Sequence, residues 1–489
     1  MSTLIEDLSE FLGGLDLADV PSRVVDLVTS QILSQLATIR IGMRNTYGRQ
    51  LIEAFGPPLQ SDVQRSACVL GAIGSWLNLE DTCFVGHLSS SAVGVPLAYA
   101  YARRLGGPEL ITGVLAANEC AARLSAAATL GPFRGQTAMH THLAGAVAGR
   151  LRCERAPLEQ WSNALGIAFT MAPWALNHGF MTSDARVLHA FNPIRSAMDS
   201  CDAAAVGLTG PADILEHPGG FLDQFATVPL PESVTAGLGE RWHTDTLSFK
   251  LHPGGPGIDT AVDCAIELHD AVAERGVDDI AEVTVRASLY TTLADRTAAA
   301  YVDGPATPMG ALLLRTEYSV ATALMTGGLR PDDFLPPAVG RHERWRLAAK
   351  IKLDHDEVMT RELFSGDAPF GEAIRQAGSR ADPWLRSVGG DELVQLLDVP
   401  APPRKSFTNA TKRTPARVTV KFRDGTVVSR GRLIPVGAAG SERYATHYEL
   451  TREKFLAAGG PPDVADAVAE LCDIGPAAMG SLIRQALFG

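Results

Sequence analysis

The sequence lacks a surplus of positive charge. Its 489 residues include 43 lysines and arginines but 55 aspartates and glutamates, which gives a formal net charge of −12 at pH 7. A nucleic-acid-binding protein needs a basic face to offset phosphate charge, so this balance excludes nucleic acid as a partner. The overall field also repels anions, and an anionic substrate would therefore need a local cationic pocket.

Cysteine is scarce and scattered along the chain. The sequence has seven cysteines, with no CxxC pair and no cysteine–histidine cluster that has the spacing of zinc ligands. This pattern is typical of buried thiols in a reducing compartment, and we expect no metal site. The cysteines are Cys68, Cys83, Cys120, Cys153, Cys201, Cys264 and Cys472.

Long apolar runs and a basic N-terminal segment are also missing. The apolar stretch 92–102 is interrupted by Gly and Pro and ends at Arg103, well short of the ~20 residues that span a bilayer. The first residues, MSTLIEDLSEFLGGLDLADV, carry acidic side chains where a secretory signal carries basic ones. We therefore expect a cytoplasmic protein with no membrane partner.

Alanine, leucine and glycine are abundant, and they dominate the sequence up to about residue 240. Segment 110–130, LITGVLAANECAARLSAAATL, is typical, with small and apolar residues at helical spacing. Small residues let helices pack closely, so residues 1–249 are predicted to form a helical domain. A chain of this length exceeds one ordinary core, and we expect at least one further domain.

The sequence pattern changes near residue 250. Segment 282–289, EVTVRASL, alternates as a strand does, and segment 416–437 holds two alternating runs around Asp424–Gly425, which predicts a hairpin. Residues 441–489 are helical again and are predicted to fold back onto the first domain. The predicted fold is therefore mainly α with an α+β insertion, in which residues 250–440 form the smaller α/β domain.

Segment 79–91, LEDTCFVGHLSSS, combines acidic residues, a threonine and a histidine ahead of a serine run. Asp81 and Thr82 can cap or interrupt a turn, and the serines can cap the helix that follows. His87 lies just before a helix start, where the positive dipole end favours a neutral, proton-accepting imidazole. The segment is thus either a helix entrance or an acid–base site.

Segment 180–221 is the most distinctive in the chain. Arg186, His189 and Arg195 precede a small-residue helix that stops at Gly207, and an LTGP turn then opens the next helix at Pro211. Charged groups beside a tightly packed helix indicate a pocket wall. The alternative is that the arginines neutralise nearby aspartates on a solvated face.

The element GLTGPADILEHPGGF, residues 207–221, resembles the MmgE/PrpD family of dehydratases, decarboxylases and isomerases. The order of NLEDT…GHLSSS, GERWHTDTLSFKLHP, RTEYSVATALMTGG and GTVVSRGRLIPVG agrees with that resemblance. It implies a large all-helical domain built from both chain ends, an inserted lid domain, a homodimer, and catalysis between the domains without metal or other cofactor.

The resemblance also implies roles for residues of the helical domain. His87 would move the proton, and Asp81 would orient His87 or bind substrate. Asn78 occupies a position that is acidic in relatives, and we count it and His189 among the predicted substrate-binding residues. Arg186 stands where relatives have lysine, and because it stays protonated it can clamp a carboxylate but cannot relay a proton.

In the lid, Lys250 falls on the lysine that opens this domain, and Tyr318 falls on or beside its tyrosine, the predicted acid. The lid histidine of decarboxylating relatives falls within PGGPG, at Gly255. A positioned acid or base is worth ~100- to 10,000-fold in rate, so His252 or Tyr318 would have to replace it. The family's GxHxT stretch is only loosely echoed by GQTAMHTH, residues 135–142.

These residues predict a metal-independent lyase, specifically a dehydratase with an altered substrate that carries a carboxylate or an enolisable carbonyl. Arg186 and Lys250 would hold the substrate oxygens while His87 removes a carbon-bound proton. One alternative is an isomerase, epimerase or cyclising tailoring enzyme that acts on a larger biosynthetic metabolite. Another is a catalytically degenerate dimer that binds a small acid. Convergence of Arg186, Lys250 and His87 in space would favour catalysis.

Overall fold

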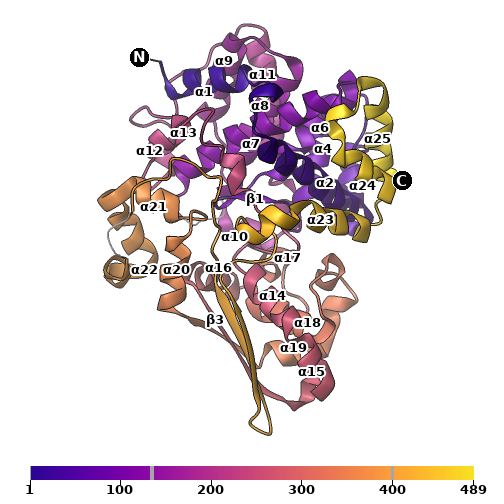
Figure 1. Ribbon diagram of the computed structural model, residues 1–489, viewed down its shortest axis with the longest axis vertical. Coiled ribbons are helices and arrows are strands. Elements are labelled where there is room, and N and C mark those ends of the chain that lie inside the picture. The colour runs from indigo at the N-terminus through magenta and orange to yellow at the C-terminus, as the bar shows by residue number, and fades with distance from the viewer. Residues whose placement is uncertain (1, 133–136, 398–400) are drawn as a thin grey trace.

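Helices dominate the fold, and a small mixed β-sheet lies within the second half of the chain (Figure 1). The computed structural model describes residues 2–132, 137–397 and 401–489. Within these ranges, no helix combines the length and the apolar character that crossing a membrane requires. The mainly helical character and the mixed sheet confirm the predicted fold class in outline.

The first half of the chain is a layered array of helices around one large hydrophobic core. Helices α7 and α8 form its most extensive contact, because small residues let the backbones approach. A Cβ atom at Gly113 of α7 would lie only 2.8 Å from the Cys153 sulfur of α8, and one at Gly149 of α8 would lie 3.4 Å from Ala117 Cβ of α7. The helices are α1 (Leu4–Gly13), α2 (Ser22–Arg44), α3 (Thr46–Phe55), α4 (Val63–Ser75), α5 (Ser89–Ala92), α6 (Gly94–Arg103), α7 (Gly107–Ala128), α8 (Thr137–Glu154), α9 (Leu158–Thr170), α10 (Asn177–Thr182), α11 (Phe191–Ala205), α12 (Phe221–Phe225) and α13 (Glu232–Thr235).

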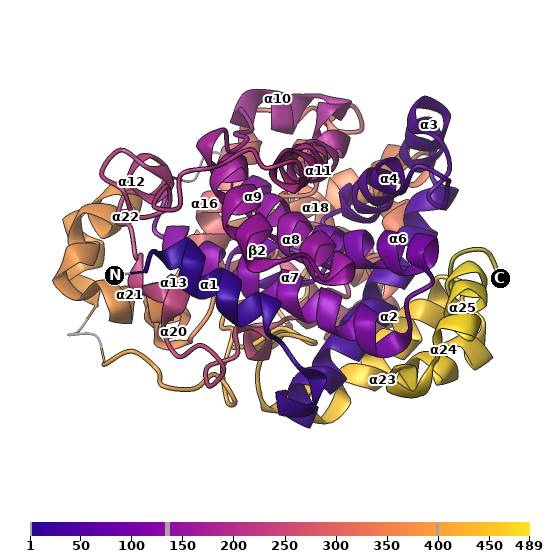
Figure 2. The ribbon, with the colours of Figure 1, turned by 90° about the horizontal axis from the view of Figure 1, so that it is seen from above.

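The last three helices return to this core. Helices α23 (Ser441–Ala457), α24 (Pro462–Ala469) and α25 (Pro476–Phe488) pack against α2, and Figure 2 shows them beside it. Arg40 of α2 is 2% exposed and donates hydrogen bonds to the carbonyl oxygens of Ala458, Gly459, Ala486 and Gly489. One buried guanidinium therefore binds the ends of two of the three helices.

The sheet has the strand order β4-β3-β5-β6. Strand β3 (Ile280–Ala287) pairs in parallel with β4 (Ile351–His355) and antiparallel with β5 (Ala416–Phe422). Strand β6 (Val427–Arg432) completes the predicted hairpin, which turns at Asp424–Gly425 with the glycine at φ +89°. The two strands thus form where the sequence predicts them, although only β5 alternates between buried and more exposed side chains.

Two smaller hydrophobic cores complete the fold, and the first of them includes the buried face of the sheet. The first packs helices α14 (Asp259–Glu267), α15 (His269–Arg275), α18 (Thr316–Thr326) and α19 (His342–Ala348) against it. The second contains side chains of α20 (Glu357–Ser365), α21 (Gly371–Ala377) and α22 (Asp382–Leu396), with α16 (Leu289–Ala299) packed against it. Helix α17 (Met309–Leu312) lies between α10 and α16.

Segment 76–88 contributes to all three cores. Trp76, Leu77 and Leu79 belong to the core beside the sheet, Phe84 belongs to the helical core, and Val85 belongs to the third. The chain between these anchors is therefore held where the three cores meet.

Replacing Arg40 with methionine should lower the free energy of unfolding by about 2–3 kcal/mol, because it leaves several buried carbonyl groups without a donor. Urea unfolding followed by circular dichroism measures this loss. The control is Arg296→Met, which removes an exposed arginine of α16. Equal stabilities of the two variants would contradict the role assigned to Arg40.

Candidate active site

Residues 80–91 form a buried hairpin followed by a short helix. Strand β1 (Thr82–Cys83) pairs with β2 (Gly86–His87), and α5 begins directly at Ser89. Neither α5 nor α6 receives a side-chain cap, so the predicted capping role of the serines is wrong. Ser91 instead contacts a histidine, with 3.1 Å between its hydroxyl oxygen and His142 Nδ1.

Glu80 lies at the centre of the site, surrounded by three imidazoles. Its Oε1 atom is 3.6 Å from His87 Nδ1 and 3.9 Å from His189 Nε2, and the His142 ring is 5.6 Å from that of His189. All four side chains are buried. Among the described residues, no hydrogen-bond partner exists for either Glu80 oxygen, for His87 Nδ1 or for His142 Nε2. Buried polar atoms left unpaired are costly, so this cluster indicates a functional site rather than a structural one.

Burial sets the protonation state of this cluster. It raises the pKa of Glu80 to about 8 and lowers that of His189 to about 4. Burial, together with the Lys250 charge, lowers the pKa of His87 well below its ordinary value. At neutral pH the cluster therefore holds a protonated carboxylic acid beside neutral imidazoles. His189 Nδ1 donates to the Arg186 carbonyl oxygen at 2.6 Å, which leaves Nε2 as the acceptor on the Glu80 side.

Arg186 lies directly behind the polar wall of the site. Its Nη2 donates to Asn78 Oδ1 at 2.8 Å, and its guanidinium carbon lies 4.6 Å from the centre of the Phe180 ring. Its Nε and Nη1 atoms have no hydrogen-bond partner among the described residues. Burial lowers the Arg186 pKa to about 10, so it stays cationic at neutral pH. Asn78 also lines the cavity described below, and its NH₂ group is a donor that a ligand there can use.

Lys250 is close enough for its charge to act on both His87 and Glu80. Its ammonium group is already paired, however, with Asp259 oxygens at 2.6 and 2.7 Å. The prediction that Lys250 holds the substrate directly therefore needs correction. The Asp259 carboxylate balances the Lys250 charge. Lys250 therefore influences Glu80 and His87 through space rather than by binding the substrate.

Asp81, the predicted partner of His87, has other hydrogen-bond partners. Asp81 accepts hydrogen bonds from Ser34, Ser89 and the Lys250 backbone, and it does not contact His87. The carboxylate beside the histidine is that of the preceding residue, Glu80.

Tyr318 and His252 are not brought to this cluster. The Tyr318 hydroxyl donates to the Asp333 carbonyl oxygen, and its ring packs 4.9 Å from that of Trp345 in the core beside the sheet. His252 Nε2 lies 2.9 Å from Asp263 Oδ1. The predicted acid and the predicted replacement for the lid histidine are therefore both engaged elsewhere.

A cavity of about 470 Å³ opens onto the cluster. Asn78, His87 and His189 line it beside the cluster, and residues distant in the sequence complete the wall, among them Gly255 and Tyr290. Glu80, His142 and Tyr290 were missed in the sequence. His142 lies in GQTAMHTH, the weak echo of a family stretch, of which residues 135–136 fall outside the described residues.

Glu80, His142 and His189 also have the spacing of a metal site, since one ligand atom of each lies within 4.8 Å of the others. Arg186 and Lys250 both act on Glu80 electrostatically. Lys250 is paired with Asp259, so Arg186 is the cation beside Glu80 without a carboxylate partner among the described residues, and its charge opposes the entry of a divalent ion.

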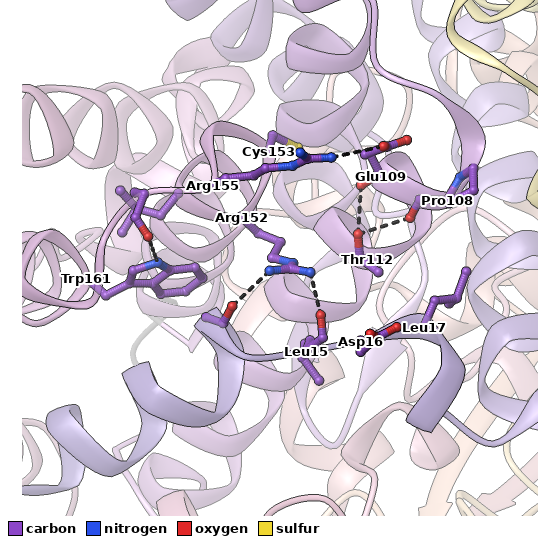
Figure 3. A pocket seen from close by; sticks show the side chains of 13 residues that line it. Leu15, Asp16, Leu17, Pro108, Glu109, Thr112, Arg152, Cys153, Arg155 and Trp161 are labelled. Atoms are coloured by element: carbon purple, nitrogen blue, oxygen red, sulfur yellow. Dashed lines mark hydrogen bonds and ion pairs between the residues drawn. The ribbon is translucent and has the colours of Figure 1, made fainter.

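A second cavity, of about 390 Å³, lies between the end of α1 and helices α7, α8 and α9 (Figure 3). Arg152 donates to the Gly13 and Leu15 carbonyl oxygens, and Arg155 pairs with Glu109 at 3.2 Å. The charged side chains that line this cavity thus bind other protein groups, and we assign the cavity a structural role.

The fold and the cluster together define a mainly helical protein with a buried acid–base site at the end of a cavity. Residues 6–233 match the model of the MmgE/PrpD N-terminal domain, and residues 252–382 match that of the MmgE/PrpD C-terminal domain. The chain belongs to the MmgE/PrpD family, whose members are generally dehydratases and related lyases. No curated protein matches the chain.

Glu80→Gln should stabilise the protein increasingly as the pH rises. A carboxyl whose folded pKa is raised from 4.5 to about 8 stabilises the fold fully below pH 4.5 and loses that contribution progressively up to pH 8. An amide has no proton to lose, so the melting temperature of the variant minus that of the wild type should rise from pH 5 to pH 8. Glu240→Gln, at an exposed site, serves as the control. A difference that stays constant with pH would show that Glu80 is ionised in the folded protein.

Proposed function

We propose that the protein is a metal-independent lyase, specifically a dehydratase, that removes a proton next to a carboxylate or carbonyl group. The observation that carries this proposal is the cluster of a protonated Glu80 and neutral His87 and His189 at the polar end of the cavity. Each element of a water-eliminating reaction, a base, an acid and an oxygen-binding group, has a candidate in this cluster.

His87 is the proposed base. Its Nδ1 faces Glu80, so Nε2 is the nitrogen available to a substrate in the cavity. The developing enolate oxygen would accept a hydrogen bond from the Asn78 NH₂ group, which Arg186 orients and polarises. In this scheme Arg186 binds the substrate through Asn78 rather than by a direct clamp.

Glu80 is the proposed acid. His189 Nε2 would accept its proton and pass it from the same nitrogen to the departing hydroxyl group, because Nδ1 is held by the Arg186 carbonyl oxygen. The protons then balance, because His87 gains the one that leaves carbon while Glu80 supplies the one that completes water. The ground state holds neutral groups, and the intermediate holds an imidazolium beside a carboxylate, 3.6 Å apart in the present geometry. Each new charge thus stabilises the other, because both side chains are buried.

Isomerisation is the second candidate function. Two imidazoles, His87 and His189, line the same cavity. One can remove a proton while the other returns a proton to a different carbon or face, with no loss of water. Epimerisation or cyclisation of a larger metabolite would use the same pair.

Incubation with hydroxy acids, unsaturated acids and larger metabolites, followed by mass spectrometry, separates these reactions. Loss of water identifies a dehydratase, loss of carbon dioxide a decarboxylase, and an unchanged mass with a new retention time an isomerase. Parallel incubations with EDTA should give the same rates.

His87→Ala should lower turnover by ~100- to 10,000-fold while leaving the circular dichroism spectrum and melting temperature nearly unchanged. The matched control is His217→Ala, which removes an exposed histidine that does not line the cavity. Full activity of the His87 variant would remove this residue from the mechanism.

We also propose a homodimer. Large apolar side chains are strongly exposed along residues 171–176 and 206–208, namely Met171, Leu176, Val206 and Leu208. Gly166 packs against Gly210, so these two segments approach each other. Exposed apolar patches of this kind mark interaction sites, and segment 171–176 leads directly into α10, which lines the cavity.

Val206→Asp combined with Leu208→Asp should halve the molar mass measured by light scattering, because a charged pair opposes burial of the patch. Val302→Asp, at another exposed apolar position, should leave the mass unchanged. A monomeric wild-type protein would refute the proposed dimer.

A further inference from the structure

The cavity wall is divided into a small polar end and a large apolar remainder. Asn78, His87 and His189 meet the acid–base cluster at one end. Neutral polar groups also come from Asn177, Tyr290, Thr297 and Ser387. Most of the remaining wall is nevertheless aliphatic or aromatic, and includes Phe180, Leu289, Leu293, Leu314, Phe370 and Trp384. Ligand cavities of ~300–1,000 Å³ hold ligands of drug size, and this one, at about 470 Å³, lies within that range.

Cations are absent from the described residues that line the cavity. Lys250 is paired with Asp259, and Arg315, next to the lining residue Leu314, is paired with Asp295 at 2.7 Å. Arg186, behind Asn78, is thus the cation placed to act on an anion at the polar end. A ligand with several carboxylates would bury the others against apolar side chains, which is strongly unfavourable.

Gly255 keeps the apolar part of the cavity open. A Cβ atom there would lie 2.6 Å from Leu314 Cδ2, and its backbone N–H is held by the Leu313 carbonyl oxygen at 2.9 Å. Any larger residue would have to displace Leu314 or extend into the cavity.

We propose that the substrate is a monoanionic acid with a large aliphatic or aromatic body, held with its carboxylate at Asn78 and its body against Phe180, Leu293 and Trp384. The placement of the substrate's carboxylate beside the acid–base cluster rests on the proposed function. The binding of the apolar body follows from the cavity wall alone.

Titration calorimetry with hexanoate, octanoate and decanoate, each below its micelle concentration, tests the apolar wall. The affinity should rise about fourfold for each added CH₂ group, the value expected for its transfer out of water. Citrate should not bind measurably. Affinities that do not depend on chain length, or citrate binding as tightly as decanoate, would overturn the proposal.

Gly255→Leu should lower the affinity for decanoate at least tenfold, because the new side chain fills the cavity. The matched control, Gly340→Leu, adds the same side chain at an exposed glycine with open space around it and should bind as the wild type does. If Gly255→Leu does not fold, Leu314→Trp serves as the test variant instead, because it fills the same region of the cavity from a neighbouring residue. Decanoate binding that neither variant weakens would place the ligand elsewhere and refute the proposal.

The polar end is tested by comparing decanoate with decanol. The wild type should prefer the acid, and Arg186→Met should lose that preference while retaining the dependence on chain length. A preference that survives in Arg186→Met would contradict the assigned orientation. Binding that depends on chain length, without turnover of any acid, would refute the proposed lyase but not this inference. Turnover of citrate-like acids alone would refute this inference but not the lyase.

Discussion

The structure depends on the burial of one carboxyl group, that of Glu80, where three hydrophobic cores meet. Segment 76–88 is anchored in all three cores, so Glu80 cannot turn toward solvent without disrupting each of them. Enclosed there with His87 and His189, it holds its proton at neutral pH. A protonated acid beside neutral bases is an arrangement that water would abolish, because solvation would ionise the carboxyl group.

The buried charges around the site differ in whether they have a partner. Lys250 is matched by Asp259, while Arg186 keeps two guanidinium nitrogens without a partner among the described residues. Paired charges cost little to keep buried, whereas an unpaired guanidinium is stabilised by an incoming anion. The electrostatics therefore favour one negative group at one end of the cavity. The apolar wall extends that selectivity to the rest of the ligand.

Much of the architecture could be predicted from local sequence. Helical spacing of small residues predicted the first half, alternation around Asp424–Gly425 predicted the hairpin, and GLTGPADILEHPGGF indicated the family. His87 was found because a histidine before a helix start is a local feature. Asp81 and Tyr318 were misassigned, because which side of a strand or helix faces a cavity depends on partners distant in the chain.

The sequence by itself indicated the helical first half, the hairpin, the family and two members of the acid–base cluster, His87 and His189, since these follow from periodicity and from short motifs. Only the tertiary structure decided that Glu80 rather than Asp81 meets His87, that Lys250 is neutralised, and that the cavity is apolar. The physical reason is that pKa values and ligand selectivity depend on burial and on neighbouring charges, and both are set by residues that meet only when the chain is folded.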